Sequence, residues 1–199
     1  MTTQEILAAA RAAKSALGIA PTQQRDRALL GMADALDDPA CRAAILEANA
    51  ADLDAARGHI SEVMLDRLAL SEKRLDGMAQ GIREVAALPD PVGAVLRRIE
   101  RPNGLVIEKT AVPMGVIAII YESRPNVTSD AAALALKSGN VCVLRCGKEA
   151  WRSSRAIVEA LRRGVAGAGL PVTAVNLIED TTHASANQLM TVGKPAGRP

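Results

Sequence analysis

From residue 115 onward the sequence alternates short apolar runs with segments of helical periodicity. Runs of about five apolar residues have the length of β-strands, and the segments between them place apolar side chains on one helical face. Successive strand–helix–strand units lay their strands parallel, with right-handed crossovers. The sequence therefore predicts an α/β protein with half of a doubly wound, Rossmann-like parallel sheet. We expect strands at 115–121, 141–145 and 172–178, and helices at 127–137, 153–165 and 181–190.

The first ninety residues predict a succession of helices. Thr2 and Glu5 form a capping-box pattern ahead of an amphipathic segment. Asp38 before Pro39 is typical of a cap and first-turn pair. The most regular apolar spacing runs from Ser71 to Leu88.

A β-hairpin is predicted between these two regions. Residues 94–100 and 105–110 flank a turn that contains Asn103 and Gly104. Both arms carry many charges, and an isolated two-stranded ribbon is marginal in water. We expect the hairpin to extend a sheet elsewhere in the protein or in a neighbouring subunit. The alternative is a solvated surface flap.

Composition excludes several classes of protein. A formal net charge of +2, with both signs interspersed, disfavours nucleic-acid binding. No apolar window is long enough for a membrane helix, and the first ten residues lack the pattern of a signal peptide, so we expect a cytoplasmic protein. Three cysteines predict reduced thiols. No metal is expected, because Cys142 and Cys146 have no further ligand pair near them.

Polar residues follow the first two predicted strands, where open α/β sheets bind ligands. Arg145 and Lys148 could hold a nucleotide phosphate there, or be solvated loop charges. Asn126 could donate to an oxyanion, although an N-cap is the simpler interpretation. Cys146 has cationic neighbours that would favour a thiolate, yet neither histidine is placed to act as its base.

Two further local patterns concern the second crossover helix. We expect Ser153 or Ser154 to cap its start. Gly164, Gly167 and Gly169 resemble a dinucleotide fingerprint, but they leave a helix and enter a strand. Phosphate cradling needs the opposite order, so we interpret these glycines as a helix stop.

Several long segments resemble the γ-glutamyl phosphate reductase (glutamate-5-semialdehyde dehydrogenase) family of the aldehyde dehydrogenase superfamily. The resemblance runs from the first helix to about residue 190, as the N-terminal portion of such an enzyme. The matching segments are GVIAIIYESRPNVT (115–128), DAAAL (130–134), KSGN (137–140), LRCGKEA (144–150), ILEAN (45–49), DL (52–53), LDRL (65–68), LPDPVG (88–93), GLP (169–171) and NLIED (176–180).

The resemblance implies NADPH-dependent reduction of L-glutamate 5-phosphate to L-glutamate 5-semialdehyde with release of phosphate, a step of proline biosynthesis. In that family a cysteine thiolate attacks the acyl phosphate, and hydride transfer to the thioester follows. Asn126 matches the oxyanion-hole asparagine, while Arg145 and Lys148 match the segment that contacts the cofactor. The hairpin resembles part of the oligomerisation domain, and the parent enzyme is expected to be a homo-oligomer.

Two departures from the family bear on activity. Cys146 stands where the family commonly has glycine, and the family's nucleophilic cysteine lies downstream of residue 199, so we expect a truncated chain that is inactive alone. The alternative is a non-catalytic nucleotide-binding or subunit-interaction module. The expected organisation is a helical part of the cofactor-binding domain (1–93), the hairpin (94–112), the Rossmann-like NADPH-binding part (113–190) and a non-family tail (191–199), with the catalytic domain absent.

Overall fold

The computed structural model describes residues 1–191. Of the predicted tail 191–199, only Thr191 lies within the described residues. The α-helices are α1 (Thr3–Gly18), α2 (Thr22–Asp37), α3 (Pro39–Ala56), α4 (Glu62–Leu68), α5 (Glu72–Ala87), α6 (Asn126–Lys137), α7 (Trp151–Gly167) and α8 (His183–Thr191). The strands are β1 (Val95–Glu100), β2 (Val106–Thr110), β3 (Val116–Ile120), β4 (Val141–Arg145) and β5 (Val175–Leu177), and two 3₁₀ turns are η1 (Lys148–Ala150) and η2 (Val172–Ala174).

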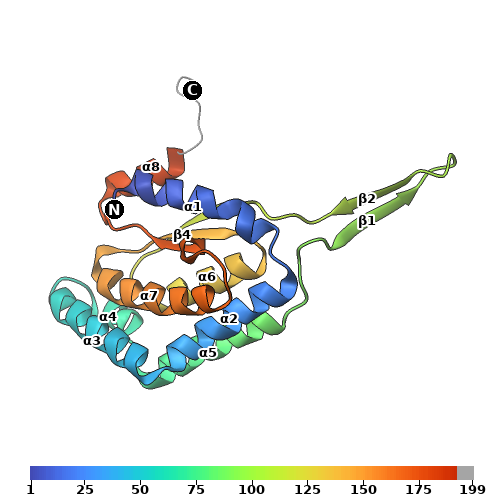
Figure 1. The fold of residues 1–199 in the computed structure, drawn as a ribbon. Coiled ribbons are helices and arrows are strands. Elements are labelled where there is room, and N and C mark those ends of the chain that lie inside the picture. Colours follow the sequence, from blue (N-terminus) through green and yellow to red (C-terminus); the bar gives the residue numbers. More distant parts are fainter. Residues whose placement is uncertain (192–199) are drawn as a thin grey trace.

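A three-stranded parallel sheet with the order β3-β4-β5 lies at the centre of the fold. Helix α1 packs on one face of the sheet and α6 and α7 pack on the other (Figure 1). Strand β4 is completely buried between its neighbours, whereas β3 is an edge strand and exposes 43% of Ile120. The predicted α/β fold and its parallel sheet are confirmed. The third strand is shorter than expected, because η2 occupies the start of the apolar run.

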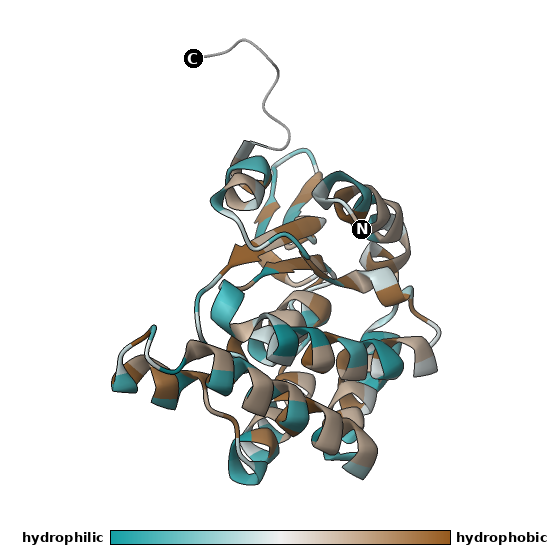
Figure 2. Cartoon of the chain, turned by 90° about the vertical axis from the view of Figure 1, so that its left-hand side faces the viewer, coloured by the Kyte–Doolittle hydropathy of each residue, from teal (hydrophilic) through white to brown (hydrophobic). Residues whose placement is uncertain are grey.

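Helices α2, α3 and α5 form a further layer against α6 and α7 (Figure 1). The buried apolar residues of this layer and of the sheet form one cluster, so the helical first half and the strand-containing second half share a core. Figure 2 shows the strands as hydrophobic ribbons inside this core, with the hydrophilic residues concentrated on the outer helices. None of the helices within residues 1–191 is long and apolar enough to cross a membrane.

The local start signals of the first helices are confirmed. Thr2 and Glu5 form both hydrogen bonds of a capping box at α1. The Asp38 side chain accepts from the N–H of Cys41, with Pro39 in the first turn of α3, and Ser71 caps α5. Helix α4 was not predicted, because its seven residues are too few for a periodic pattern to emerge.

The predicted cap of α7 is wrong. The helix begins at Trp151 after Ala150, which has no side chain that can cap, and Ser153 lies in the first turn. The carboxylate of Asp52, on α3, accepts hydrogen bonds from the Ser153 N–H (2.8 Å) and hydroxyl (2.7 Å). Asn49 donates to the same hydroxyl at 3.1 Å. A helix 101 residues earlier in the chain therefore caps α7.

The helix-stop interpretation holds for the end of α7 but is wrong for Gly164. Helix α7 ends at Gly167, and Gly169 has a φ of 73°. Gly164 lies inside the helix, where α7 crosses α2. A Cβ atom at this position would lie 2.2 Å from the backbone nitrogen of Met32 and 2.3 Å from the carbonyl carbon of Gly31. The absence of a side chain thus permits contact between the two helix backbones.

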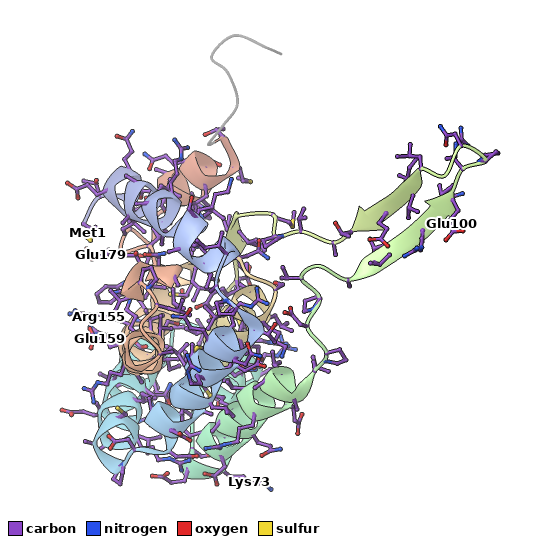
Figure 3. The ribbon with its side chains drawn as sticks, turned by 45° about the vertical axis from the view of Figure 1, so that its right-hand side comes forward. Met1, Lys73, Glu100, Arg155, Glu159 and Glu179 are labelled. Atoms are coloured by element: carbon purple, nitrogen blue, oxygen red, sulfur yellow. The ribbon has the colours of Figure 1, made fainter. Side chains whose placement is uncertain are left out.

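The predicted hairpin is confirmed as an antiparallel pair of β1 and β2, with Gly104 at a φ of 80° in the turn. It projects far from the body, with Glu100 near its tip (Figures 1 and 3). Arg98 pairs with Glu108 across the strands at 3.0 Å. Its arms also expose large apolar side chains, namely Val95, Leu96, Leu105, Val106 and Ile107. Among the described residues no third strand pairs with the hairpin.

A buried ionic cluster fixes the base of the hairpin to the body. Arg25 exposes only 2% of its side chain, and its Nη2 donates to Asp90 at 2.5 Å. Asp90 also accepts from the hydroxyl of Thr22 and from the N–H of Val92. Although burial opposes ionisation, these hydrogen bonds and the Arg25 charge hold the pKa of Asp90 below its usual value.

An ion pair joins the start of the chain to the segment between β5 and α8. The N-terminal ammonium of Met1 contacts Glu179 at 2.5 Å, which joins the start of α1 to the segment after β5 (Figure 3). On the exposed side of α7, Arg155 and Glu159 pair at 3.0 Å, one turn apart, and are labelled in the same figure. These exposed pairs contribute little to stability.

Candidate functional site

The two polar turns predicted from the sequence lie side by side. Strands β3 and β4 are parallel neighbours, with Ile120 opposite Arg145 in the register. The N–H of Tyr121 donates to the carbonyl of Arg145 at 2.9 Å. The residues that follow the two strands therefore leave the same edge of the sheet, which is the edge where open α/β sheets bind ligands.

A buried hydroxyl cluster fixes these turns relative to each other. The Tyr121 hydroxyl lies 2.7 Å from the Thr128 hydroxyl on α6. The Thr128 hydroxyl donates to the Ser154 hydroxyl on α7 at 3.3 Å. Burial raises the pKa of Tyr121 well above its usual value, so this phenol stays neutral. The cluster joins β3, α6 and α7 directly beneath the two turns.

Asn126 is the first residue of α6, and its N-cap interpretation is wrong because Pro125 occupies the cap position. Its side chain is exposed, and Nδ2 lies 3.4 Å from the Asp130 carboxylate one turn later. The amide borders a pocket of about 470 Å³ between α4, α5 and α6. Asn126 can therefore present an N–H to a group bound there. Its predicted role as an oxyanion donor stays a prediction.

Arg145 and Lys148 do not face the same cleft. The Arg145 side chain is buried, and Nη2 donates to the carbonyls of Thr181 at 2.5 Å and Thr182 at 3.0 Å. These contacts hold the segment before α8 against the end of β4. The structure therefore gives this guanidinium protein partners, and its contact with a cofactor stays a prediction.

Lys148 lies exposed in η1, directly after the turn that follows β4. It borders a cleft of about 430 Å³ between α3 and the start of α7, together with His59, Glu149 and Arg152. The cleft presents two cationic side chains beside a strand end, an arrangement that suits a phosphate. The buried carboxylate of Asp52 forms part of its wall.

None of the three cysteines is placed as a reactive thiolate. Cys41, Cys142 and Cys146 are all buried and unpaired. Burial raises the pKa of Cys142 to about 12 and that of Cys146 to about 11. For Cys146, burial outweighs the hydrogen bond from Ser154 and the charge of Arg145, both of which favour the thiolate. Within residues 1–191 no group of His, Cys, Asp and Glu is arranged to hold a metal ion.

Sequence reasoning missed three residues that shape this region. Asp52 was noted only as part of a matching segment, and no local pattern indicates that it caps another helix. Arg67 and Asp130 border the same pocket as Asn126. The i, i+4 spacing of Asn126 and Asp130 was visible in the sequence and could have placed both on one face of the predicted helix.

The fold is an open α/β sheet with two neighbouring strand-end turns, and comparison with known proteins defines its class. The sequence profile of the Aldehyde dehydrogenase family matches residues 1–195. The chain belongs to the aldehyde dehydrogenase family.

Within this family the chain is similar to γ-glutamyl phosphate reductases, as its motifs predicted. It is 57% identical to the "Gamma-glutamyl phosphate reductase" of Neisseria meningitidis serogroup C over 94% of the chain. Identity to the reductase of the same name from Streptococcus suis is 51% over 96% of the chain. The chain spans 44% and 46% of the length of these two relatives.

Solved structures agree with this placement. The crystal structure of γ-glutamyl phosphate reductase from Thermotoga maritima superimposes with a TM-score of 0.92 at 39% identity, over 96% of this chain and 46% of that one. The Saccharomyces cerevisiae reductase gives a TM-score of 0.83 at 36% identity, over 92% and 47%. A probable aldehyde dehydrogenase from Listeria monocytogenes, at 18% identity and a TM-score of 0.71, shares the fold.

Proposed function

We propose that this chain supplies the cofactor-binding half of a γ-glutamyl phosphate reductase. The reaction is NADPH-dependent reduction of L-glutamate 5-phosphate to L-glutamate 5-semialdehyde, with release of phosphate, in proline biosynthesis. The observation that carries the proposal is the similarity to enzymes of that name over 94% of the chain, at a TM-score of 0.92 to one of their structures. A cytoplasmic location fits such a biosynthetic step.

The residues present fit a phosphorylated dinucleotide cofactor at the cleft beside η1. Lys148 and Arg152 border that cleft. Lys148 forms no ion pair among the described residues, and Arg152 pairs with Asp52 at 3.5 Å. Lys148 would hold the 2′-phosphate of the cofactor there, and this contact would favour NADPH over NADH. Arg145 positions the wall of the site through Thr181 and Thr182. NADPH supplies the hydride for the reduction when it is bound.

Asn126 stabilises negative charge on the substrate. Its exposed amide lies at the first position of α6, next to the turn that follows β3. When a nucleophile adds to the acyl phosphate, the carbonyl oxygen becomes an oxyanion, and an N–H fixed by the protein stabilises that charge without reorganisation. The hydroxyl cluster of Tyr121, Thr128 and Ser154 keeps the first turn of α6 in place.

The nucleophilic thiolate is not one of the chain's own cysteines. Attack on an acyl phosphate needs an accessible thiolate, and burial keeps the thiols of Cys142 and Cys146 protonated. The described chain binds and orients, and the catalytic domain of the parent enzyme supplies the thiol. This same observation favours the second candidate function, a nucleotide-binding or subunit-interaction module without chemistry of its own.

The hairpin serves subunit assembly. Its apolar side chains lie exposed on a ribbon that contacts no third strand among residues 1–191. Its free edges can extend a sheet of another subunit, which also buries those side chains. We therefore propose that residues 94–112 form the oligomerisation element of a homo-oligomer, between a helical part at 1–93 and an NADPH-binding part at 113–190.

A fluorescence titration with NADPH and NADH tests the proposal. The chain is expected to bind NADPH more tightly, and Lys148→Ala should weaken NADPH binding roughly tenfold while changing NADH binding little. Lys73→Ala, which removes an exposed charge on α5 that does not line the cleft, is the matched control (Figure 3). Equal loss for both cofactors would remove the basis for NADPH, and no binding of either would contradict the cofactor-binding role.

A further inference from the structure

The pocket beside Asn126 is built from three helices and two signs of charge. We call it the α4–α5–α6 pocket, with a volume of about 470 Å³. Its lining combines arginines, aspartates and one asparagine with a few apolar side chains. The lining residues are Asp66, Arg67, Ala69, Leu70, Arg74, Gly77, Met78, Arg124, Asn126 and Asp130.

Two of its charged residues serve the fold. Arg74 pairs with the Asp66 carboxylate at 3.0 Å. The Arg74 guanidinium also donates to the carbonyls of Asp66 and Ala69, which ties the end of α4 to the start of α5. These two charges compensate each other. Arg67 and Arg124 are the other two cationic residues of the pocket, and no residue of the pocket lining forms an ion pair with either.

Arg67 and Arg124 meet at one place on the surface. Both border the α4–α5–α6 pocket and also an adjoining pocket of about 310 Å³. Both are exposed, and neither forms an ion pair with any residue from 1 to 191. Glu122 borders the adjoining pocket and pairs with neither. Two guanidinium groups that border the same pockets and pair with none of the nearby carboxylates can bind an anion through several hydrogen bonds.

The opposite charge comes from α6. Asp130 lies one turn after Asn126, and its hydrogen bond from the Asn126 amide is long, at 3.4 Å. Asp130 lines the pocket, is exposed and forms no ion pair with any residue from 1 to 191. Partial burial raises the pKa of its carboxyl, while hydrogen bonds from Asn126 and Ser129 act in the opposite direction. A cationic group of a ligand bound beside Asp130 would compensate the negative charge of its carboxylate. The pocket therefore combines side chains that can bind an anion with one that can bind a cation, and the Asn126 amide lies in the same lining.

We propose that the α4–α5–α6 pocket recognises the amino-acid end of the substrate, with Arg67 and Arg124 on its α-carboxylate and Asp130 on its α-ammonium. The proposal rests on the proposed function, because it requires that the substrate be a glutamyl compound whose 5-carbonyl reaches Asn126. The two charged groups of an L-α-amino acid then match the two charged sites. These residues make the site specific for an amino acid over a simple carboxylic acid.

Nuclear magnetic resonance titration of the full 199-residue chain tests this recognition with stable probes. L-Glutamate carries both charged groups, glutarate lacks the ammonium, and 4-aminobutyrate lacks the α-carboxylate. L-Glutamate is expected to shift the backbone amides around Arg67, Arg124 and Asp130, and to bind roughly tenfold more tightly than either truncated probe. Absence of these shifts, or equal affinity for glutarate, would overturn the proposal.

Variants assign each charge to its partner. Asp130→Asn should weaken L-glutamate to the affinity of glutarate and leave glutarate unchanged, because that probe has no ammonium to lose. Arg67→Gln should weaken L-glutamate roughly tenfold and leave 4-aminobutyrate unchanged. Arg11→Gln, an exposed charge on α1, is the matched control. If Arg11→Gln weakened L-glutamate binding as much as Arg67→Gln, the loss would come from the net charge of the protein, and the proposal would be overturned.

The two proposals fail separately. NADPH binding through Lys148 is measured on the same chain and does not involve the α4–α5–α6 pocket. A chain that binds NADPH but shows no response to L-glutamate would contradict only the amino-acid site. A chain that binds neither would contradict the proposed function as well.

Discussion

Asp52 shows how a single buried carboxylate can complete a helix in another part of the chain. It exposes 2% of its surface and accepts two hydrogen bonds from Ser153 in the first turn of α7. Free N–H groups at a helix start carry partial positive charge, so a carboxylate satisfies them both by hydrogen bonding and by charge. The same contact fixes α3 beside η1, where Lys148 lies.

Replacing Asp52 by Ala should therefore destabilise the protein. The change leaves the Ser153 N–H and hydroxyl buried without their hydrogen-bond acceptor. We expect the free energy of unfolding to fall by about 2 kcal/mol. Urea denaturation followed by circular dichroism measures it. Asp54→Ala, two residues away and exposed, should change stability little. Equal effects of the two variants would contradict the capping role.

Gly164 gives a second prediction, which concerns close packing. Gly164→Ala places a methyl group within 2.3 Å of the α2 backbone, so the helices must separate, at a cost of about 3 kcal/mol. Gly167→Ala is the matched control in the same helix, because a Cβ there meets nothing within 4 Å. Thermal melts should show a large drop for the first variant and none for the second. Similar melting temperatures would refute the tight crossing.

A third prediction concerns pH and the base of the hairpin. Asp90 has a lowered pKa in the folded state, so its ionised form stabilises the fold above its usual pKa of 3.8, and this contribution is lost as the pH falls through the folded value. Asp90→Asn also leaves Arg25 buried without its carboxylate, and should cost about 3 kcal/mol at neutral pH. The gap in unfolding free energy between wild type and variant should stay constant down to about pH 5 and narrow below about pH 4. A gap independent of pH would contradict this role.

At the scale of elements, the sequence predicts those features whose cause is local. The caps at Thr2 and Asp38 lie within three residues of the N–H groups that they satisfy, and the Asn-Gly turn defines the hairpin. The α7 cap could not be predicted in the same way, because its partner is on α3. Gly164 likewise has the composition of a helix stop, and only the crossing with α2 explains it.

In the candidate site, too, the sequence predicts what is local and not what depends on tertiary contacts. Position after a strand is a local property, so the sequence could place Asn126 and Lys148 at the ligand-binding edge of the sheet. Where a side chain points depends on tertiary neighbours, and the contacts of Arg145 with Thr181 and Thr182 come from a segment 36 residues further along the chain. The pocket shared by Arg67 and Asn126 depends on α4, which the sequence pattern did not reveal.

The hairpin carries the prediction that belongs to this scale. Its two ends are joined by hydrogen bonds between Gly93 and Ala111 (2.8 Å) and between Ala111 and Ala94 (2.9 Å), so residues 95–110 can be replaced by a short glycine-serine loop without moving the body. We expect the intact chain to self-associate and the shortened chain to be a monomer with an almost unchanged melting temperature. Light scattering coupled to size-exclusion chromatography measures both. An intact chain that is monomeric, or a shortened chain that still associates, would contradict the assembly role.

At the scale of the whole molecule, the chain combines one continuous apolar core with binding sites at its strand ends. The helical layers cover both faces of the sheet, and one apolar cluster runs through them. The strand-end turns, the cleft at Lys148 and the amide of Asn126 supply sites for binding and for charge stabilisation. The three cysteines are buried, including Cys146, which lies in the turn that follows β4. The central claim is that the chain provides the cofactor-binding half of the enzyme without its nucleophile.

The measurement that tests this claim most directly is the reverse reaction, phosphate-dependent oxidation of glutamate 5-semialdehyde with NADP⁺, followed by the absorbance of NADPH. The purified 199-residue chain is predicted to show no rate above that of the buffer, because neither Cys142 nor Cys146 forms a thiolate at neutral pH. Turnover that disappears in Cys146→Ser would make that residue the nucleophile, and turnover that survives the change would contradict the account as a whole.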